Sequence, residues 1–297
     1  MRIFLAGATG VIGQRLVPLL VAQGHQVTGL ARSAAAGERL RALGASAALA
    51  DVFDPAALAD AVAGASPEVV IHQLTDLSAY RLDANSRIRQ VGTRNLVDAA
   101  RMAEAGRMVA QSISWAYQPG QDPAAEDVPL DLDADAPRRG TVAGVAALEA
   151  AVRELPEWVL LRYGLLYGPG TWYAADGLMA DRARAGELAA SADVASFVHV
   201  DDAATAAAAA LSWPTGAVNV CDDEPAAGDD WVPVFCASVG APPPGPGPGS
   251  GSSSGSGSAG AAAAGRQGWA RGASNRHARS DLGWTPSRPS WRDGFGG

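Results

Sequence analysis

The chain has 297 residues, of which 48% are hydrophobic and 18% charged, with a formal net charge of −8. This length supports one large core or two unequal ones. The excess of acidic residues argues against a nucleic-acid-binding surface. The sequence contains no run of about eighteen apolar residues, so a membrane span is not predicted. The opening MRIFLAGATG lacks the segments of a secretory signal, and the two cysteines fit neither a metal site nor a disulfide framework, so we expect a cytoplasmic protein.

Strands and helices alternate along the first part of the chain. Short apolar runs predict strands at 2–7, 26–32, 46–51, 68–74, 107–112 and 158–164. Apolar residues at helical spacing predict helices at 11–25, 91–106 and 145–155, the first with a kink at Pro18. This alternation is typical of an α/β protein with a Rossmann-like, doubly wound parallel sheet covered on both faces.

The regular alternation of predicted strands and helices ends after residue 163. Helices are predicted at 176–186 and 201–213, and strands at 196–200 and 216–223. We expect 1–163 to form a dinucleotide-binding domain to which 197–222 return, and 164–196 with 223–297 to form a small C-terminal substrate-binding subdomain. Within the latter, the Gly/Ser/Pro-rich segment 241–265 is predicted to be a mobile insertion, and the aromatic tail 274–295 to pack back onto the body.

A glycine-rich turn links the first strand to the first helix. Gly7 allows the tight turn, Gly10 lets the backbone approach a pyrophosphate, and Gly13 permits close helix–strand packing. The helix amino end then offers N–H groups and a positive dipole end to phosphates. Thr9, Val11 and Ile12 belong to the same predicted cofactor-binding turn.

The ends of the next strands indicate which dinucleotide binds. An Asp or Glu is expected after the second strand for NAD, but Arg32 and Ser33 stand there, and they are suited to a 2′-phosphate. We therefore predict NADP, with NAD as the alternative. Asp51 and Val52 are placed to meet the adenine, and Leu74 and Tyr163 complete the predicted cofactor contacts.

These residues resemble the extended, epimerase/dehydratase-like branch of the short-chain dehydrogenase/reductase superfamily. The resemblance is carried by the Gly7–Gly13 turn, Asp51-Val52, VVIHQL, GTRNLVDAA, LRYGLLYGPG, FVHVDD, VNVCDDEP and LGWTPSRPSWRDGF, and it spans nearly the whole chain outside the insertion. It implies a nicotinamide over the strand ends and a Tyr-x-x-x-Lys pair assisted by Ser or Thr. It does not name a substrate.

The expected Tyr-Lys pair is missing. Glu149 resembles the glutamate four residues after the family's lysine, which places Val145 at the lysine position and Thr141 at the tyrosine position. In the family, the lysine binds the ribose and lowers the pKa of the tyrosine so that it exchanges protons near neutrality. All 23 basic residues of this chain are arginine, so a shifted alignment does not restore the pair.

Other polar residues near the strand ends are candidates for catalysis. Ser112, Ser114 and Tyr117 lie in SISWAY, which resembles the family's serine segment; Tyr167 lies in LLYGPG; and His72 follows a buried strand and titrates near neutrality. Each also has a structural interpretation, as a packed or hydrogen-bonded core residue. A tyrosine beside Arg162 would have its phenolate stabilised by the guanidinium. His199, Asp201 and Asp202 are too cramped for a metal site, with either aspartate suited to cap a helix.

The sequence thus predicts an NAD(P)-dependent enzyme that acts on a small molecule by a carbonyl or carbinol redox step without the usual dyad. A first alternative is a non-redox epimerase, dehydratase or cyclase in the same cleft. A second is a non-catalytic NADP-sensing module, against which the retained substrate-side half argues. We expect no nucleic-acid or membrane partner, and a homodimer remains an open alternative.

Overall fold

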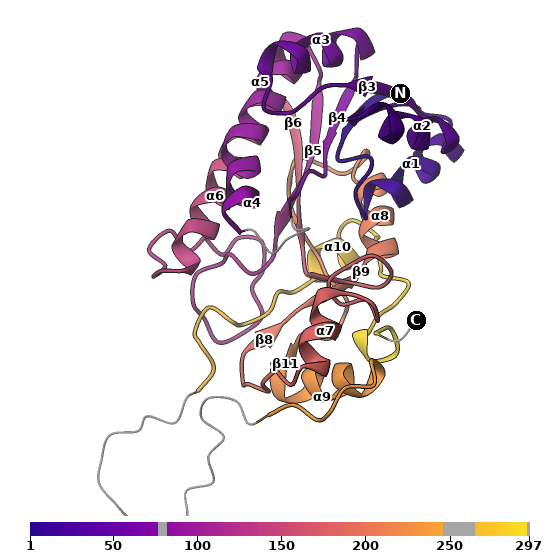
Figure 1. Ribbon diagram of the computed structural model, residues 1–297. Coiled ribbons are helices and arrows are strands. Elements are labelled where there is room, and N and C mark those ends of the chain that lie inside the picture. Colours follow the sequence, from indigo (N-terminus) through magenta and orange to yellow (C-terminus); the bar gives the residue numbers. More distant parts are fainter. Residues whose placement is uncertain (77–81, 246–264, 296–297) are drawn as a thin grey trace, which may run out of the picture.

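A parallel sheet forms the centre of the molecule, in a computed structural model that describes residues 1–76, 82–245 and 265–295. Within these residues the sheet has seven strands in the order β10-β6-β5-β4-β1-β2-β3, and every neighbouring pair is parallel (Figure 1). This confirms the predicted Rossmann-like fold. In chain order the strands are β1 (Arg2–Ala6), β2 (Gln26–Ala31), β3 (Ser46–Leu49), β4 (Val69–His72), β5 (Arg107–Ile113), β6 (Glu157–Tyr163) and β10 (Gly216–Val220).

Helices cover both faces of this sheet, because its central strands are apolar on both sides. In β1, Ile3 and Leu5 point to one face, whereas Phe4 and Ala6 point to the other. The first face carries α1 (Gly13–Ala22), α2 (Ala34–Ala42) and α8 (Val200–Ala209). The second carries α3 (Pro55–Ala65), α4 (Leu82–Arg87), the π-helical turn η1 (Ile88–Gly92), α5 (Thr93–Met102) and α6 (Arg138–Val152).

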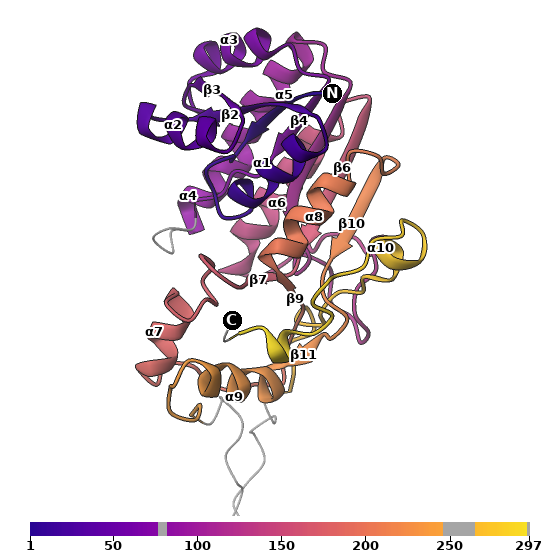
Figure 2. The same ribbon diagram turned by 90° about the vertical axis from the view of Figure 1, so that its right-hand side faces the viewer.

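A smaller lobe lies at the carboxyl ends of the strands (Figure 2). It contains α7 (Leu178–Arg184), α9 (Gly228–Ser238), and two short strand pairs. In these, β7 (Leu165–Tyr167) runs parallel to β9 (Phe197–His199), and β8 (Val194–Ala195) antiparallel to β11 (Ala226–Ala227). Its core is aromatic, and Phe197, Phe235 and Phe295 are each at most 1% exposed.

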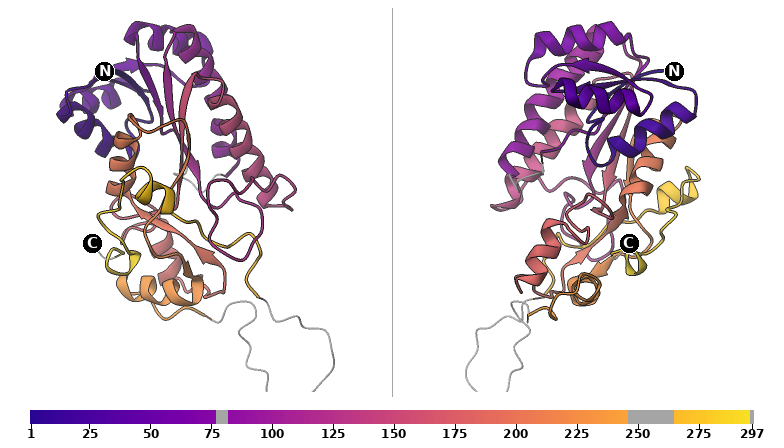
Figure 3. Two further views of the ribbon diagram at one scale, coloured as in Figure 1. Left: turned by 180° about the vertical axis from the view of Figure 1, so that it is seen from behind. Right: turned by 45° about the vertical axis from the view of Figure 1, so that its right-hand side comes forward.

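The aromatic tail packs onto both parts of the molecule, as predicted. It contains α10 (Arg276–Ser280) and the 3-10 turn η2 (Trp291–Asp293). Trp284 joins the core beneath α8, whereas Trp291 joins the core of the lobe. Figure 3 shows the tail running from the sheet to the lobe in both views. Most of the predicted insertion, 246–264, lies outside the described residues.

Helix α1 continues through Pro18, and α6 begins at Arg138, well before the predicted start at 145.

Both cysteines are buried and unpaired. No helix in the described part of the chain combines the length and apolar character that crossing a bilayer requires.

Candidate functional site

The turn after β1 has a shape that only glycine fits. Gly7 has φ +93°, and a Cβ there would lie 2.5 Å from the backbone of Gln73. A Cβ on Gly13 would lie 2.2 Å from the carbonyl oxygen of Gly7. Helix α1 begins at Gly13, and no side chain caps its amino end. The backbone therefore leaves a cradle at a helix amino end, which suits a diphosphate.

This turn lies where the strand order reverses. Since β1 sits between β2 and β4, consecutive connections leave in opposite directions from this point, and a crevice opens outside the strand ends. The Gln73 amide donates to the Ala6 carbonyl at 2.7 Å, and its side-chain Nε2 donates to the Tyr163 hydroxyl at 3.2 Å. Thus the ends of β1, β4 and β6 are linked along one edge.

The predicted adenosine-side residues follow β2 and β3. Arg32 is exposed, and the ion pairs found among the described residues do not include it. Ser33 caps α2, its hydroxyl accepting from the Ala36 amide at 3.3 Å. Asp51 accepts from the Phe53 amide at 2.9 Å, while Val52 is buried in the core. Near Thr9, a hollow of about 240 Å³ opens between α1 and α2, and Arg39 is among its lining residues.

His72 has the environment of a core residue. Its Nε2 lies 2.8 Å from the Thr93 hydroxyl, and its Nδ1 accepts from the Leu74 amide at 3.1 Å. Burial, followed by the charge of Arg89, lowers the pKa of His72 to about 4. The imidazole is therefore neutral near pH 7 with both nitrogens engaged.

A buried polar network joins β5, β6, β10 and α6. Glu149 accepts from Arg162 at 2.9 Å and 2.7 Å and from the Ser112 hydroxyl at 2.8 Å. On its other side, Arg162 donates to the Tyr117 hydroxyl at 3.0 Å, and Tyr117 donates to the Asn219 Oδ1 at 2.6 Å. The predicted contact between a tyrosine and Arg162 is present, since Tyr117 lies beside the guanidinium. The charge of that guanidinium is already compensated by the Glu149 carboxylate.

The three predicted tyrosines are all buried. Tyr117, Tyr163 and Tyr167 are at most 3% exposed, and burial is the main cause that raises the pKa of each hydroxyl above its usual value. Tyr167 donates to the Ser290 carbonyl at 3.4 Å and packs edge-on against His199. Each phenol is therefore protonated and held by internal partners.

Helix α6 carries Thr141 and Val145, the residues at the predicted tyrosine and lysine positions, and Thr141 is half-buried. Val145 is 1% exposed and packs with Val142, Ala116 and Ala134 in a small apolar cluster. The predicted lysine position is thus filled by core packing.

A cavity of about 410 Å³ lies between the end of β5 and the lobe. Ser114 and Trp115 line it from the sheet side, Trp231 lines it from α9 of the lobe, and Trp269 lines it from the segment that precedes the tail. Arg182 is the cation among the described lining residues, and it pairs with Glu187 at 3.1 Å. Of this set the sequence predicted Ser114 alone; the tryptophans lie far apart along the chain, with no spacing pattern to join them.

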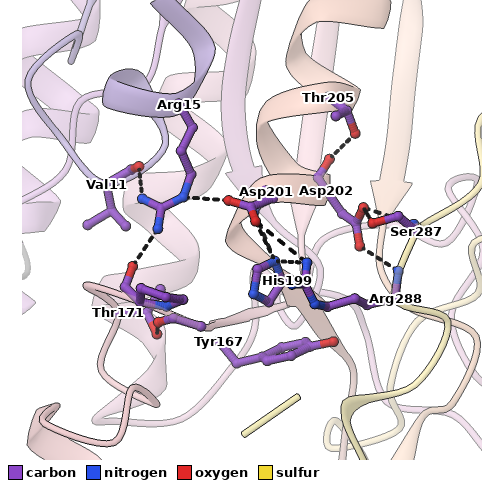
Figure 4. A network of polar contacts seen from close by, with 12 residues as sticks. Val11, Arg15, Tyr167, Thr171, His199, Asp201, Asp202, Thr205, Ser287 and Arg288 are labelled. Atoms are coloured by element: carbon purple, nitrogen blue, oxygen red, sulfur yellow. Dashed lines mark hydrogen bonds and ion pairs between the residues drawn. The ribbon is translucent and has the colours of Figure 1, made fainter. Parts of the chain in front are cut away.

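A second polar network joins α1 to α8, to the loop after β7 and to the tail (Figure 4). Arg15 donates to the Val11 carbonyl at 3.0 Å, to Asp201 at 2.6 Å and to the Pro169 carbonyl at 2.9 Å, which ties the glycine turn to α8 and to the loop after β7. Asp202 accepts from the amide and hydroxyl of Ser287 in the tail. The expectation that an aspartate caps α8 was wrong: His199 does so, accepting from the Asp201 amide at 3.2 Å, because its Nδ1 faces that amide.

Comparisons with known proteins extend this description. Residues 3–221 match the NAD dependent epimerase/dehydratase family. The chain is 46% identical to a Streptomyces protein named 3-diazoavenalumate denitrifying reductase, over 100% of this chain and 99% of the relative. It is 31% identical to the 2-alkyl-3-oxoalkanoate reductase of Stenotrophomonas maltophilia, over 82% of this chain and 77% of that one.

Solved structures share the fold at low identity. The UDP-glucose 4-epimerase of Thermus thermophilus, solved as a complex with NAD, matches with a TM-score of 0.74 and 23% identity, over 100% of this chain and 97% of the epimerase.

Proposed function

The chain belongs to the NAD dependent epimerase/dehydratase family and is an NAD(P)-dependent oxidoreductase or epimerase, and from this premise we propose that it is an NADPH-dependent reductase that removes a diazo group from a small molecule as N2. The observation that carries the proposal is a cofactor cradle without the proton-donating pair. A full-length relative named for denitrifying reduction supports the reaction type.

The cradle fits a dinucleotide. The close approach at Gly7 and Gly13 and the uncapped start of α1 suit the diphosphate. NADP is favoured over NAD because Arg32 stands where an acidic residue would hold a ribose, and Arg39 lines the hollow beside Thr9. Both guanidinium groups would hold a 2′-phosphate. When bound, NADPH supplies a hydride.

Among the described residues, the proton donors that the sequence predicts for the cleft are missing or engaged. The chain contains no lysine, and Val145 fills the corresponding place. Tyr117 and Tyr163 are shut inside the core with the pKa of each raised, and His72 is neutral with both nitrogens engaged. A ketone would need a proton as well as a hydride, so this arrangement favours a substrate that needs only the hydride.

A diazo group that is carried on an aromatic ring as a diazonium cation meets that need, because the cation already holds the positive charge that a hydride neutralises. The hydride brings two electrons and forms the new C–H bond, the C–N bond breaks, and its electron pair leaves with N2. In this balance NADPH would be the reductant and the diazonium group the oxidant, and the protein would not have to supply a proton. The residues of the cleft then have to bind, orient and exclude water.

The cavity beside Ser114 is the proposed substrate site. Its tryptophan-lined wall suits a flat, conjugated molecule, and Arg182 would meet a carboxylate, such as the one implied in the name of the Streptomyces relative's substrate, by giving up its pairing with Glu187. Ser114 would contact the substrate there, whereas Ser112 and Tyr117 would keep the strand ends in place through Glu149 and Arg162.

The test uses purified protein, NADPH and 3-diazoavenalumate as the probe. We expect loss of NADPH absorbance with one N2 released per NADPH oxidised. With NADPH deuterated at the transferred position, deuterium enters the product; with unlabelled NADPH in D2O, the transferred position stays unlabelled. Absence of NADPH oxidation, or of N2, would refute the proposal.

Two arms separate the alternative functions. A 2-alkyl-3-oxoalkanoate serves as the ketone probe, and faster turnover of this substrate would favour carbonyl reduction with another proton donor. Product formation without net NADPH oxidation would favour a non-redox epimerase, dehydratase or cyclase.

A further inference from the structure

A buried arginine without an acidic partner lies at the carboxyl edge of the sheet. Arg89 is 4% exposed, and its Nε is buried with no hydrogen-bond acceptor. Burial lowers the pKa of Arg89 to about 10, and no carboxylate among the described side chains offsets that effect. A buried cation without a compensating charge destabilises a folded chain. The burial of Arg89 in this form therefore points to a functional role.

The position of Arg89 points toward the cleft. It belongs to η1, the π-helical turn between α4 and α5, a feature often found at functional sites. One turn further along, Thr93 contacts His72, the last residue of β4. Arg89 therefore lies about one turn beyond the strand end, and helical side chains lean toward the helix amino end, which here is the direction of the cleft.

The neighbour of Arg89 is helix α6. A methyl group on Gly144 would lie 3.5 Å from the Arg89 Cδ, so the stem of the arginine runs against this helix, one residue before Val145. Arg162, the other buried arginine at these strand ends, is compensated by Glu149. Among the described residues, Arg89 is thus a buried cation at this edge whose charge is not compensated by a carboxylate.

We propose that Arg89 is a cofactor-binding residue, whose guanidinium donates hydrogen bonds to oxygen atoms of the bound dinucleotide. This rests on the proposed function, because it assigns a residue to the same cofactor cleft. The bound oxygens complete the pairing that the free protein lacks. The free protein consequently carries the cost of the charge, and the complex recovers it.

The experiment measures two quantities on the full chain: the NADPH dissociation constant without substrate, and the Tm of the cofactor-free protein. Arg89→Met removes the charge and keeps much of the stem, whereas Arg89→Lys keeps a charge. Arg101→Met is the matched control, since Arg101 is a half-exposed arginine of α5 that pairs with Glu154. We expect Arg89→Met to raise the NADPH dissociation constant about tenfold or more and to keep or raise the Tm.

Arg89→Lys should bind NADPH with an affinity between wild type and Arg89→Met, and Arg101→Met should bind as wild type does. An Arg89→Met protein that binds NADPH normally, that loses stability or fails to fold, or that changes only the KM of the diazo substrate would overturn the assignment. Wild-type protein that binds no NADPH would instead refute the proposed function itself.

Discussion

Replacing Glu149 by leucine tests whether the buried network at the strand ends is one electrostatic unit. Glu149 accepts both hydrogen bonds that Arg162 makes to a carboxylate, and the side chains of the pair are 2% and 4% exposed. Leucine removes the charge with little change in volume. Arg162 would then keep only the Tyr117 hydroxyl and the Glu126 carbonyl as acceptors.

The expected loss of unfolding free energy is about 3–5 kcal/mol, the range for breaking one side of a buried ion pair. At about 2–4 °C per kcal/mol for a chain of this size, the Tm should fall by roughly 10 °C. The additional bond from Arg153 contributes little, because that arginine is half-exposed.

Denaturant and thermal unfolding measure the effect, with Glu154→Leu as the control. Glu154 also pairs with two arginines, at 2.6 Å and 2.9 Å, but it is 42% exposed and should cost about 1 kcal/mol or less. The double variant Glu149→Leu/Arg162→Met should recover much of the loss, since it leaves no unpaired charge. Equal losses for the Glu149 and Glu154 variants, or additive losses in the double variant, would refute the reasoning.

Four further predictions concern the cofactor, the backbone and pH. Arg32→Asp should raise the NADPH dissociation constant about tenfold or more without weakening NADH binding; equal losses in both titrations would contradict a 2′-phosphate contact. Gly13→Ala should abolish NADPH binding, because its Cβ would lie 2.2 Å from the Gly7 carbonyl oxygen, and a wild-type titration curve would count against the cradle. Burial raises the pKa of Asp222 to about 8, so its contribution to stability is present at low pH and is lost as pH rises from about 4 to 8. The Tm of Asp222→Asn should therefore gain on that of wild type over this range, and a constant difference would contradict this assignment. With 3-diazoavenalumate, kcat should be flat from roughly pH 6 to 9, since the pKa of His72 is about 4 and burial raises the pKa of Tyr117, Tyr163 and Tyr167 above the usual value of a phenol; a bell-shaped profile would indicate a titrating donor.

The fold could be predicted because its signals are local. Alternating apolar runs predicted each strand of the sheet, and the glycine turn at 7–13 predicted a first helix from residue 11, close to the observed start at Gly13. The early start of α6 was missed, because RRGTVAG contains two glycines and a threonine, which are poor helix formers. Tertiary packing of Val142 and Val145 overrides that propensity.

The candidate site was less predictable, because it depends on contacts between distant segments. Ser112 and Tyr117 were identified from a short segment, yet their partners Glu149 and Asn219 come from α6 and β10. Arg89 carries no sequence signal of its own: one arginine on a helix usually faces solvent. Only its burial beside Gly144 sets it apart.

The two unusual features of the cleft have one physical explanation. A lysine at position 145 would serve both as a cation for the cofactor and as the group that lowers the pKa of a neighbouring phenol. A guanidinium at Arg89 can act as the cation for the cofactor, but it scarcely releases a proton, even with its pKa at about 10. When the two roles are separated in this way, the cleft keeps a cation that binds the cofactor but lacks a group that transfers a proton to the substrate. A substrate whose leaving group is N2 needs the bound cofactor but no proton donor. A proton donor near such a cleft would add a route for side reactions with water.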